Sequence, residues 1–144
     1  MRKIISLLCL LCLLLCSCGF GRKIEWDVDS IESINIVELG EWNEENFRYE
    51  ITVLCEISNC SEFVDRLNEL EQHKIIYGQP RVLHKGATAI QINYLNGDFD
   101  LVACLVQSTY RSGEYNYRQV TFDSEQFSGL IEEVKTNNGF VPSK

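Results

Sequence analysis

TAIQINYLNGDFDLVACLVQSTYRSGEYNYRQVTF, residues 88–122, is the stretch that decides the fold of this 144-residue chain. Apolar and polar side chains alternate along much of it, which is typical of antiparallel strands that bury one face. Asn96-Gly97 and Ser112-Gly113 interrupt the pattern, and such pairs favour two-residue hairpin turns. The sequence therefore predicts three consecutive strands joined by two tight turns.

These two turns also predict the register of the strands. The first places Tyr94 opposite Phe99, the second places Leu105 opposite Val120, and both pairings put the apolar side chains on one face. Because a one-residue slip would turn this set to solvent, we expect that face to be buried. The opposite face is expected to be solvated, because it would carry Gln91, Asn93, Asp98, Asp100 and Gln119.

A second hairpin is predicted earlier in the chain. Residues 31–39 are rich in apolar and β-branched side chains, and residues 47–57 alternate strictly between apolar and polar positions. The connection, residues 40–46, is polar and contains Trp42. Short strand candidates follow at residues 74–77 and 81–84, and could add an edge strand.

Two helices are predicted from capping signals and from apolar spacing. Asn59 and Asp123 are N-cap candidates, with Glu62 and Gln126 three residues later as reciprocal capping residues. Apolar side chains then recur at helical spacing, in the first helix as far as about His73 and in the second as far as about residue 137. They are Phe63, Leu67 and Leu70, then Phe127, Leu130, Ile131 and Val134.

The order of these elements predicts an α+β fold. We expect an antiparallel β-sheet of about five strands, in the order ββα-βββα, with both α-helices packed on one face. The globular part is long enough for one domain with its own core and too short for two.

The first eighteen residues have the order of a secretory signal. A basic pair, Arg2 and Lys3, precedes an apolar run over residues 4–15, which ends in Leu15-Cys16-Ser17-Cys18. A membrane-spanning helix needs about 20 apolar residues, so this run is too short for a permanent anchor.

These residues resemble the signal of bacterial lipoproteins, whose lipobox places an aliphatic residue and two small residues before a modified cysteine. Leu15, Ser17 and Cys18 fit this pattern, whereas Cys16 stands where Ala or Ser is more usual. The resemblance implies a diacylglyceryl group on Cys18, palmitate-type acylation and retention at the cell membrane on its extracytoplasmic side. The alternative is a plain secretory peptide cleaved near Ser17 or Gly19.

This interpretation divides the chain into four parts and leaves the mature domain acidic. Cleavage removes two basic residues and no acidic ones, so the formal net charge falls from −8 to −10. Such a charge repels nucleic-acid backbones and anionic lipid headgroups, which excludes nucleic acid as an expected partner. The four parts are a signal peptide (1–17), a lipidated flexible tether (18–29), a globular domain (30–137) and a C-terminal tail (138–144).

Three cysteines remain in the expected globular domain, Cys55, Cys60 and Cys104. An exported domain can form one disulfide and keep one free thiol, but we expect three reduced, partly buried thiols. Together with His73 and His84 they do not have the spacing of a compact zinc motif, so no metal is expected. Residues 96–100 carry oxygen ligands but lack the ordered acidic positions of a calcium loop.

Neither a nucleophile elbow nor a Ser-His pair in a suggestive context is present, so the sequence favours a protein without catalytic activity or cofactor. The predicted register places Tyr110, Tyr115 and Tyr117 on the face away from the helices, and amphipathic aromatic side chains are common at recognition surfaces. With Trp42 in the acidic loop they form the expected contact residues for a protein or cell-envelope ligand. The alternatives are a cell-envelope thiol redox factor or enzyme using Cys60 or Cys104, and a structural subunit of an envelope assembly.

Overall fold

A computed structural model describes residues 23–45, 48–74, 83–118 and 120–138. Cys18 and the leader, most of the two short strand candidates, and all but the first residue of the expected tail lie outside these ranges. Within them, no helix is long and apolar enough to cross a membrane.

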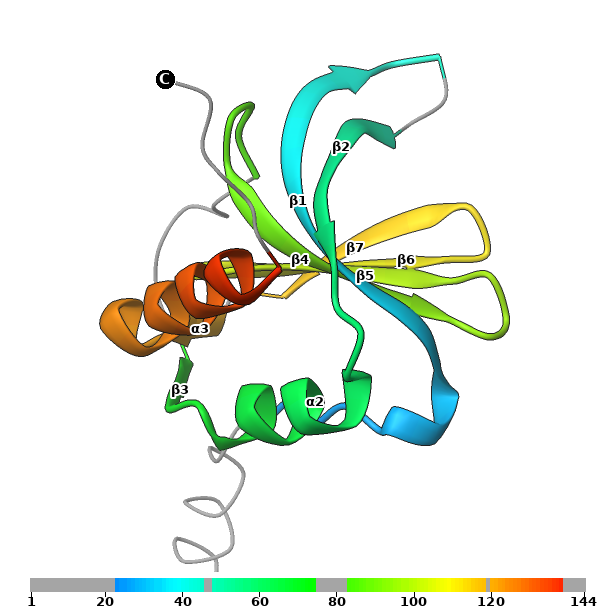
Figure 1. The fold of residues 1–144 in the computed structure, drawn as a ribbon. Coiled ribbons are helices and arrows are strands. Elements are labelled where there is room, and N and C mark those ends of the chain that lie inside the picture. Colours follow the sequence, from blue (N-terminus) through cyan, green and yellow to red (C-terminus); the bar gives the residue numbers. More distant parts are fainter. Residues whose placement is uncertain (1–22, 46–47, 75–82, 119, 139–144) are drawn as a thin grey trace, which may run out of the picture.

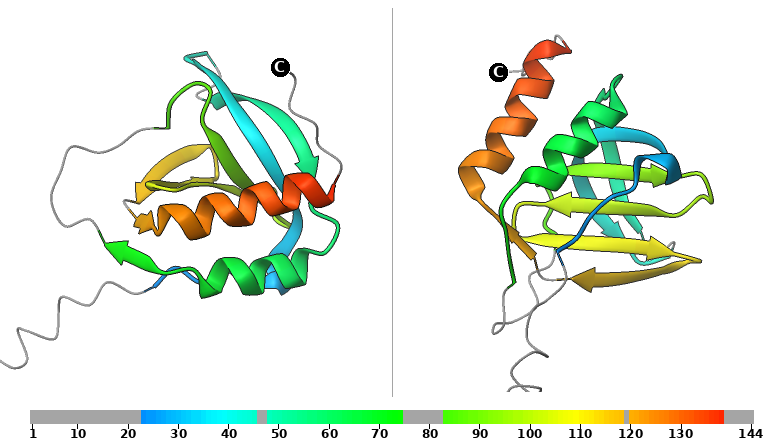
Figure 2. Two further views of the ribbon diagram at one scale, coloured as in Figure 1. Left: turned by 60° about the vertical axis from the view of Figure 1, so that its left-hand side comes forward. Right: turned by 90° about the horizontal axis from the view of Figure 1, so that it is seen from below.

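The described residues form a strongly bent antiparallel sheet with two helices on one face (Figures 1 and 2). This confirms the α+β class. The main sheet has six strands in the order β2-β1-β4-β5-β6-β7, and β3 pairs with β8 in a second, two-stranded sheet. The bounds of the strands are β1 (Ile31–Asn43), β2 (Arg48–Glu56), β3 (Gln72–Lys74), β4 (Thr88–Tyr94), β5 (Phe99–Ala103), β6 (Val106–Arg111), β7 (Glu114–Arg118) and β8 (Val120–Phe122).

Both predicted helices form, and both begin at the predicted caps. α2 (Cys60–Glu69) starts after Asn59, whose side chain accepts a hydrogen bond from the backbone N–H of Glu62. α3 (Ser124–Asn137) starts after Asp123, which accepts from the N–H of Gln126. The Gln126 side chain does not reach back to its own cap. It accepts a hydrogen bond from the N–H of Glu71, at 3.3 Å, and so links α3 to the end of α2.

The register predicted for the first tight turn is wrong by one residue. Asn93, and not Tyr94, pairs with Phe99, because the loop contains three residues, 95–97. Gly97 has a φ of 84°, the left-handed conformation that such a loop requires. The Ser112-Gly113 turn is confirmed, with Arg111 paired to Glu114 and positive φ at both turn residues.

An additional turn divides the strand that was predicted to run from residue 98 to residue 111. Ala103 pairs with Val106, so Cys104 and Leu105 form a two-residue connection between β5 and β6. The run Leu-Val-Ala-Cys-Leu-Val contains no residue typical of turns, and its apolar character follows from burial on both sides of the connection. The main sheet therefore has more strands than the five or so expected.

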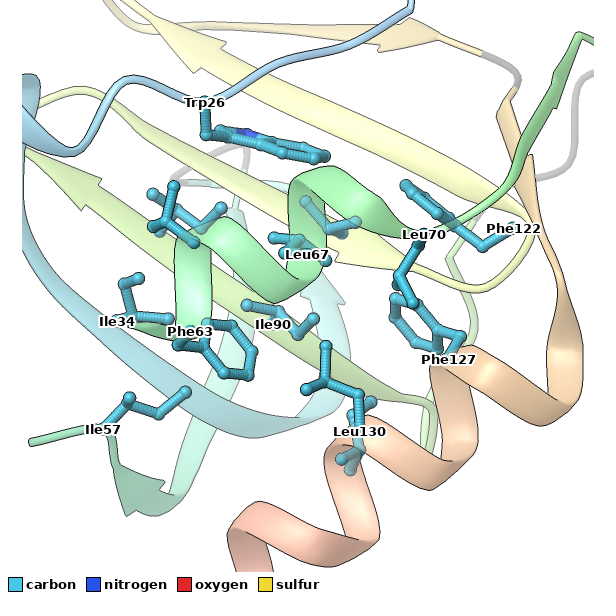
Figure 3. Close-up of a cluster of buried hydrophobic side chains, with 14 of the residues drawn as sticks. Trp26, Ile34, Ile57, Phe63, Leu67, Leu70, Ile90, Phe122, Phe127 and Leu130 are labelled. Carbon is cyan, nitrogen blue, oxygen red and sulfur yellow. The ribbon is translucent and has the colours of Figure 1, made fainter. Parts of the chain in front are cut away.

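Each face of the sheet has its own apolar core. Figure 3 shows the larger one, in which residues of α2 and α3 such as Phe63 and Phe127 pack onto Ile34 and Ile90 of the sheet. The second core lies on the opposite face and contains Val37, Leu39, Leu83, Ala89, Phe99, Leu101 and Val106. The prediction that this face is solvated is therefore wrong.

The second core is covered because the sheet curls on itself. A hydrogen bond of 2.6 Å joins the Arg48 guanidinium of β2 to the Tyr110 hydroxyl of β6. In the sheet order, three strands lie between β2 and β6. The sheet must bend toward a half-barrel for these side chains to meet, and this bend encloses the second core.

Residues 23–30, which we call the N-terminal strap, pack against the domain and end in the 3-10 turn η2 (Val28–Ser30). Ile24 and Trp26 are buried in the larger core. The Asn68 and Gln72 side chains each make two hydrogen bonds to the strap backbone, at Trp26 and Ile24 respectively, with lengths of 2.8–2.9 Å. Residues 23–29, which were expected to belong to a flexible tether, are thus packed against the domain.

Candidate binding surface

The aromatic residues that the sequence singled out lie on three strands. Trp42 is near the end of β1, Tyr110 is in β6, and Tyr115 and Tyr117 are in β7. Tyr110 pairs with Tyr115 across the β6–β7 hairpin, and Ser108 pairs with Tyr117. The side chains of Tyr115 and Tyr117 lie outside what the structure describes. Tyr110 packs against the second core, on the face away from the helices.

Trp42 is presented by an irregular end of the β1–β2 hairpin. The register shifts between Leu39 and Trp42, as expected for a β-bulge, which re-aims the side chains that follow it. Gly40 lies in this segment, and a Cβ atom there would stand 2.8 Å from the Cβ of Glu50. Only glycine fits such a close approach. Gly40 therefore permits the bulge that precedes Trp42.

Trp42 and Tyr110 belong to one group of side chains, which we call the aromatic rim: Trp42, Arg48, Tyr49 and Tyr110. The Trp42 ring meets Tyr49 edge to face, with centroids 4.9 Å apart. The Arg48 guanidinium lies 4.7 Å from the centre of the Tyr110 ring and donates a hydrogen bond to the hydroxyl of the same residue. Tyr110 in turn stacks on Phe99 at 4.8 Å. The rim therefore rests on the second core.

The rim is partly open to solvent, because Trp42 is 37% exposed and Arg48 is exposed, whereas Tyr49 and Tyr110 are half-buried. Sequence reasoning missed Arg48 and Tyr49 as members of this group. Tyr49 occupies an apolar position of the alternating strand, which identified it as a core residue only. Nothing local indicates Arg48, because its contact with Tyr110 spans 62 residues and depends on the bend of the sheet.

A buried carboxylate lies under the strap, on the helix-covered face. Asp100, expected on a solvated face, is 2% exposed. Its Oδ2 accepts hydrogen bonds from the Trp26 indole N–H (3.1 Å), the Tyr94 hydroxyl (2.8 Å) and the Gln107 amide (2.8 Å). Its Oδ1 accepts from Arg111 at 2.7 Å. The one-residue change in the β4–β5 register is what turns Asp100 inward.

Arg111 and Tyr94 line a shallow hollow of about 390 Å³ beside this carboxylate, together with Ser30, Leu95, Asn96 and Asp98. Burial, with the nearby Asp100 charge, raises the pKa of Tyr94 far above its usual value, so its hydroxyl remains a donor. Arg111 also donates to the carbonyls of Phe99 and Tyr110. The donors around Asp100 thus hydrogen-bond to its carboxylate, and this buried network stabilises the fold.

Burial disfavours the thiolate form of two of the cysteines. Burial raises the pKa of the Cys55 and Cys104 thiols, and the nearby Asp123 charge adds to the effect at Cys104. A raised pKa lowers the thiolate fraction at neutral pH, and the thiolate is the reactive form. The Cys60 thiol donates to the Ile57 carbonyl at 3.5 Å. Cys104 lines a mostly apolar hollow of about 340 Å³ with Leu83, His84, Ala87, Thr88, Ala103, Leu105 and Val106.

Among the residues that the structure describes, no cluster of His, Cys, Asp and Glu side chains is suited to hold a metal ion. The oxygen-rich run over residues 96–100 spans the end of the β4–β5 loop and the first two residues of β5. Asp98 accepts a hydrogen bond from the N–H of Ser112 and lies 3.8 Å from Arg111. Its carboxylate therefore ties together the two hairpin loops at this end of the sheet.

Comparison with known protein families, with curated proteins and with solved structures finds no match for this chain.

Proposed function

We propose that this chain is a lipid-anchored extracytoplasmic protein whose domain binds a protein or cell-envelope ligand without catalysing a reaction. The anchor would be diacylglycerol on Cys18, as the lipobox resemblance implies. The ligand would contact the aromatic rim and the neighbouring β7 tyrosines, Tyr115 and Tyr117. The observation that carries the binding proposal is the partly exposed Trp42, held by Tyr49 beside an arginine that lies over Tyr110.

The composition of the rim supports this proposal. Trp, Tyr and Arg are the residue types most enriched at the energetic centres of protein interfaces. Aromatic side chains lose little conformational entropy on binding, and those of the rim are already held by ring contacts. The Arg48 charge also gives this surface a local donor in a protein whose formal net charge is −8, which favours a ligand with acceptor groups.

The binding proposal can be tested by photo-crosslinking in the native host. A photoreactive phenylalanine analogue at position 42 should give discrete adducts, and Arg48→Ala should remove them. The matched control is the same analogue at position 53, because Val53 is 54% exposed and belongs to the same hairpin. Equal adducts at both positions, or adducts that persist without Arg48 in a folded variant, would contradict a ligand at the rim.

The anchor is tested separately from the ligand. Mass spectrometry of the mature N-terminus from membrane fractions should find a lipidated Cys18, and Cys18→Ala should leave the precursor unprocessed. An unmodified Cys18 in membrane-derived protein would contradict the anchor and leave the photo-crosslinking result standing.

A further inference from the structure

The strap determines how far the folded domain can lie from a lipid on Cys18. The structure describes the chain from Lys23, and Ile24 is already buried. Six Cα–Cα steps join Cys18 to Ile24, and a fully extended chain spans at most about 3.6 Å per residue. The docking point of the strap is therefore held within about 22 Å of the lipid-bearing residue.

This docking point lies at one end of the molecule. Lys23 donates to the carbonyl of Asn68 near the end of α2, and Ile24 is paired with Gln72 at the start of β3. α2 and the strap lie along one side of the domain in Figures 1 and 2, and the far end of the β1–β2 hairpin lies on the opposite side. β1 has 13 residues, and its length along the bent strand is roughly 40 Å at about 3.3 Å per residue, which is an upper bound on the distance between its ends.

We propose that the α2 side of the domain faces the bilayer and that the aromatic rim points away from it. This inference rests on the proposed anchor at Cys18 and deepens the proposed function, because it selects the kind of partner. The rim would then meet a macromolecule of the extracytoplasmic space in preference to a lipid headgroup of the same membrane.

The charge of the membrane-proximal side does not contribute to this orientation. The short length of chain between Cys18 and the strap is what would produce it. Exposed acidic residues lie along the strap and the outer surface of α2, namely Glu25, Asp27, Asp29, Asp65 and Glu69. Anionic lipids repel such a surface over about one Debye length, roughly 10 Å at 0.1 M salt. The α2 side should therefore come closest to zwitterionic bilayers, and should move away from anionic ones at low salt.

The orientation can be measured without any ligand. The native lipoprotein is reconstituted into phosphatidylcholine vesicles that carry a nitroxide on their headgroups, and a fluorophore is attached at Glu69→Cys or at Glu45→Cys. Cys55, Cys60 and Cys104 are replaced by alanine in both cases. We expect several-fold stronger quenching at position 69 than at position 45. A twenty-residue Gly-Ser insertion between Gly21 and Arg22 should abolish the difference.

Trypsin gives the same comparison on the unsubstituted protein, in case the cysteine-free form does not fold. Lys23 and Arg48 are both exposed, so vesicles should slow cleavage after Lys23 and leave cleavage after Arg48 unchanged. Equal quenching and equal protection at the two ends, in protein that floats with the vesicles, would overturn the orientation and leave the anchor intact. Protein that does not float with the vesicles would overturn both.

Discussion

The face of the sheet under the helices and the face that carries the aromatic rim are both apolar at their centres, but they differ at their margins. On the helix-covered face the strap and two helices cover the sheet, and the buried Asp100 carboxylate accepts four hydrogen bonds. On the other face the bend of the sheet encloses a core that also contains Leu83, from the segment before β4, and Trp42 remains partly exposed at its edge. The buried carboxylate and the partly exposed aromatic rim thus lie on opposite faces. Substitutions on the helix-covered face should accordingly lower the free energy of unfolding, whereas substitutions in the aromatic rim should mainly affect binding of the proposed ligand.

The largest expected effect is at Trp26. Trp26→Ala removes a ring that is 5% exposed and stacks on Phe122, and it also removes one donor from Asp100. Truncation of a buried tryptophan costs about 3–5 kcal/mol. Urea unfolding should show this loss, and a loss below about 1 kcal/mol would mean that the strap is not part of the core.

Arg111→Ala should have the next largest effect. It leaves Asp100 without its charged partner while that carboxylate stays 2% exposed, which should cost about 1–3 kcal/mol. The control is Arg66→Ala, because the Arg66 side chain is similarly exposed but pairs with Glu133 at the surface. Thermal unfolding should show a much smaller change for the control. Equal changes would contradict a role for the burial of Asp100.

Removal of the strap's hydrogen bonds should cost less. Asn68→Ala with Gln72→Ala removes four part-buried hydrogen bonds, whose backbone partners can bond to water when the strap loosens. We expect a loss of about 1–2 kcal/mol and faster hydrogen exchange at residues 24–26. Glu125→Ala, on the exposed surface of α3, is the control. Unchanged exchange would show that packing alone holds the strap.

Trp42→Ala should have the smallest effect on stability among these substitutions. The substitution removes one edge-to-face contact with Tyr49, which is worth about 0.5–1.5 kcal/mol. The same variant should lose the ligand proposed for the rim. The contrast between Trp26 and Trp42, measured in one unfolding series, tests the division between the two faces directly.

The thiols should show a pH effect with no loss of stability at neutral pH. Because burial raises the pKa of Cys55 and Cys104, the protonated thiol is favoured in the folded state. Their contribution to stability is complete below the pKa of an unfolded thiol, about 8.5, and is lost as the pH rises through the folded values. Alkylation should be slower than for a free cysteine at pH 7 and should accelerate at higher pH. Rapid modification of Cys104 at pH 7 would support the thiol-enzyme alternative instead.

Much of the fold could be predicted because its signals are local. The caps at Asn59 and Asp123 and the Ser112-Gly113 turn depend on residues within a few positions of each other. Asn96-Gly97 was misinterpreted because Gly97 suits both a two-residue and a three-residue loop, and that one residue decides whether Asp100 is buried. The connection at Cys104 and Leu105 contains no turn-forming residue, so only tertiary packing determines it.

The candidate site was less predictable than the fold. Trp42 and Tyr110 could be selected by residue type, but their surroundings depend on the bend of the sheet, which no local pattern encodes. The strap did carry a usable signal, because Ile24, Trp26 and Val28 alternate with acidic residues as in a half-buried extended segment. That signal was outweighed by the glycines and charges around it.

The contacts that hold the strap, which include the side-chain amides of Asn68 and Gln72, also set the order in which the strap would detach under a mechanical load. A pull applied at the N-terminal end reaches the contact of Lys23 with the Asn68 carbonyl first, then the Gln72 amide at Ile24 and the Asn68 amide at Trp26, and only afterwards the indole. Force would therefore peel this segment in steps while the sheet stays intact. Single-molecule pulling should record short early extensions before global rupture, and rupture in a single step would rule out such peeling.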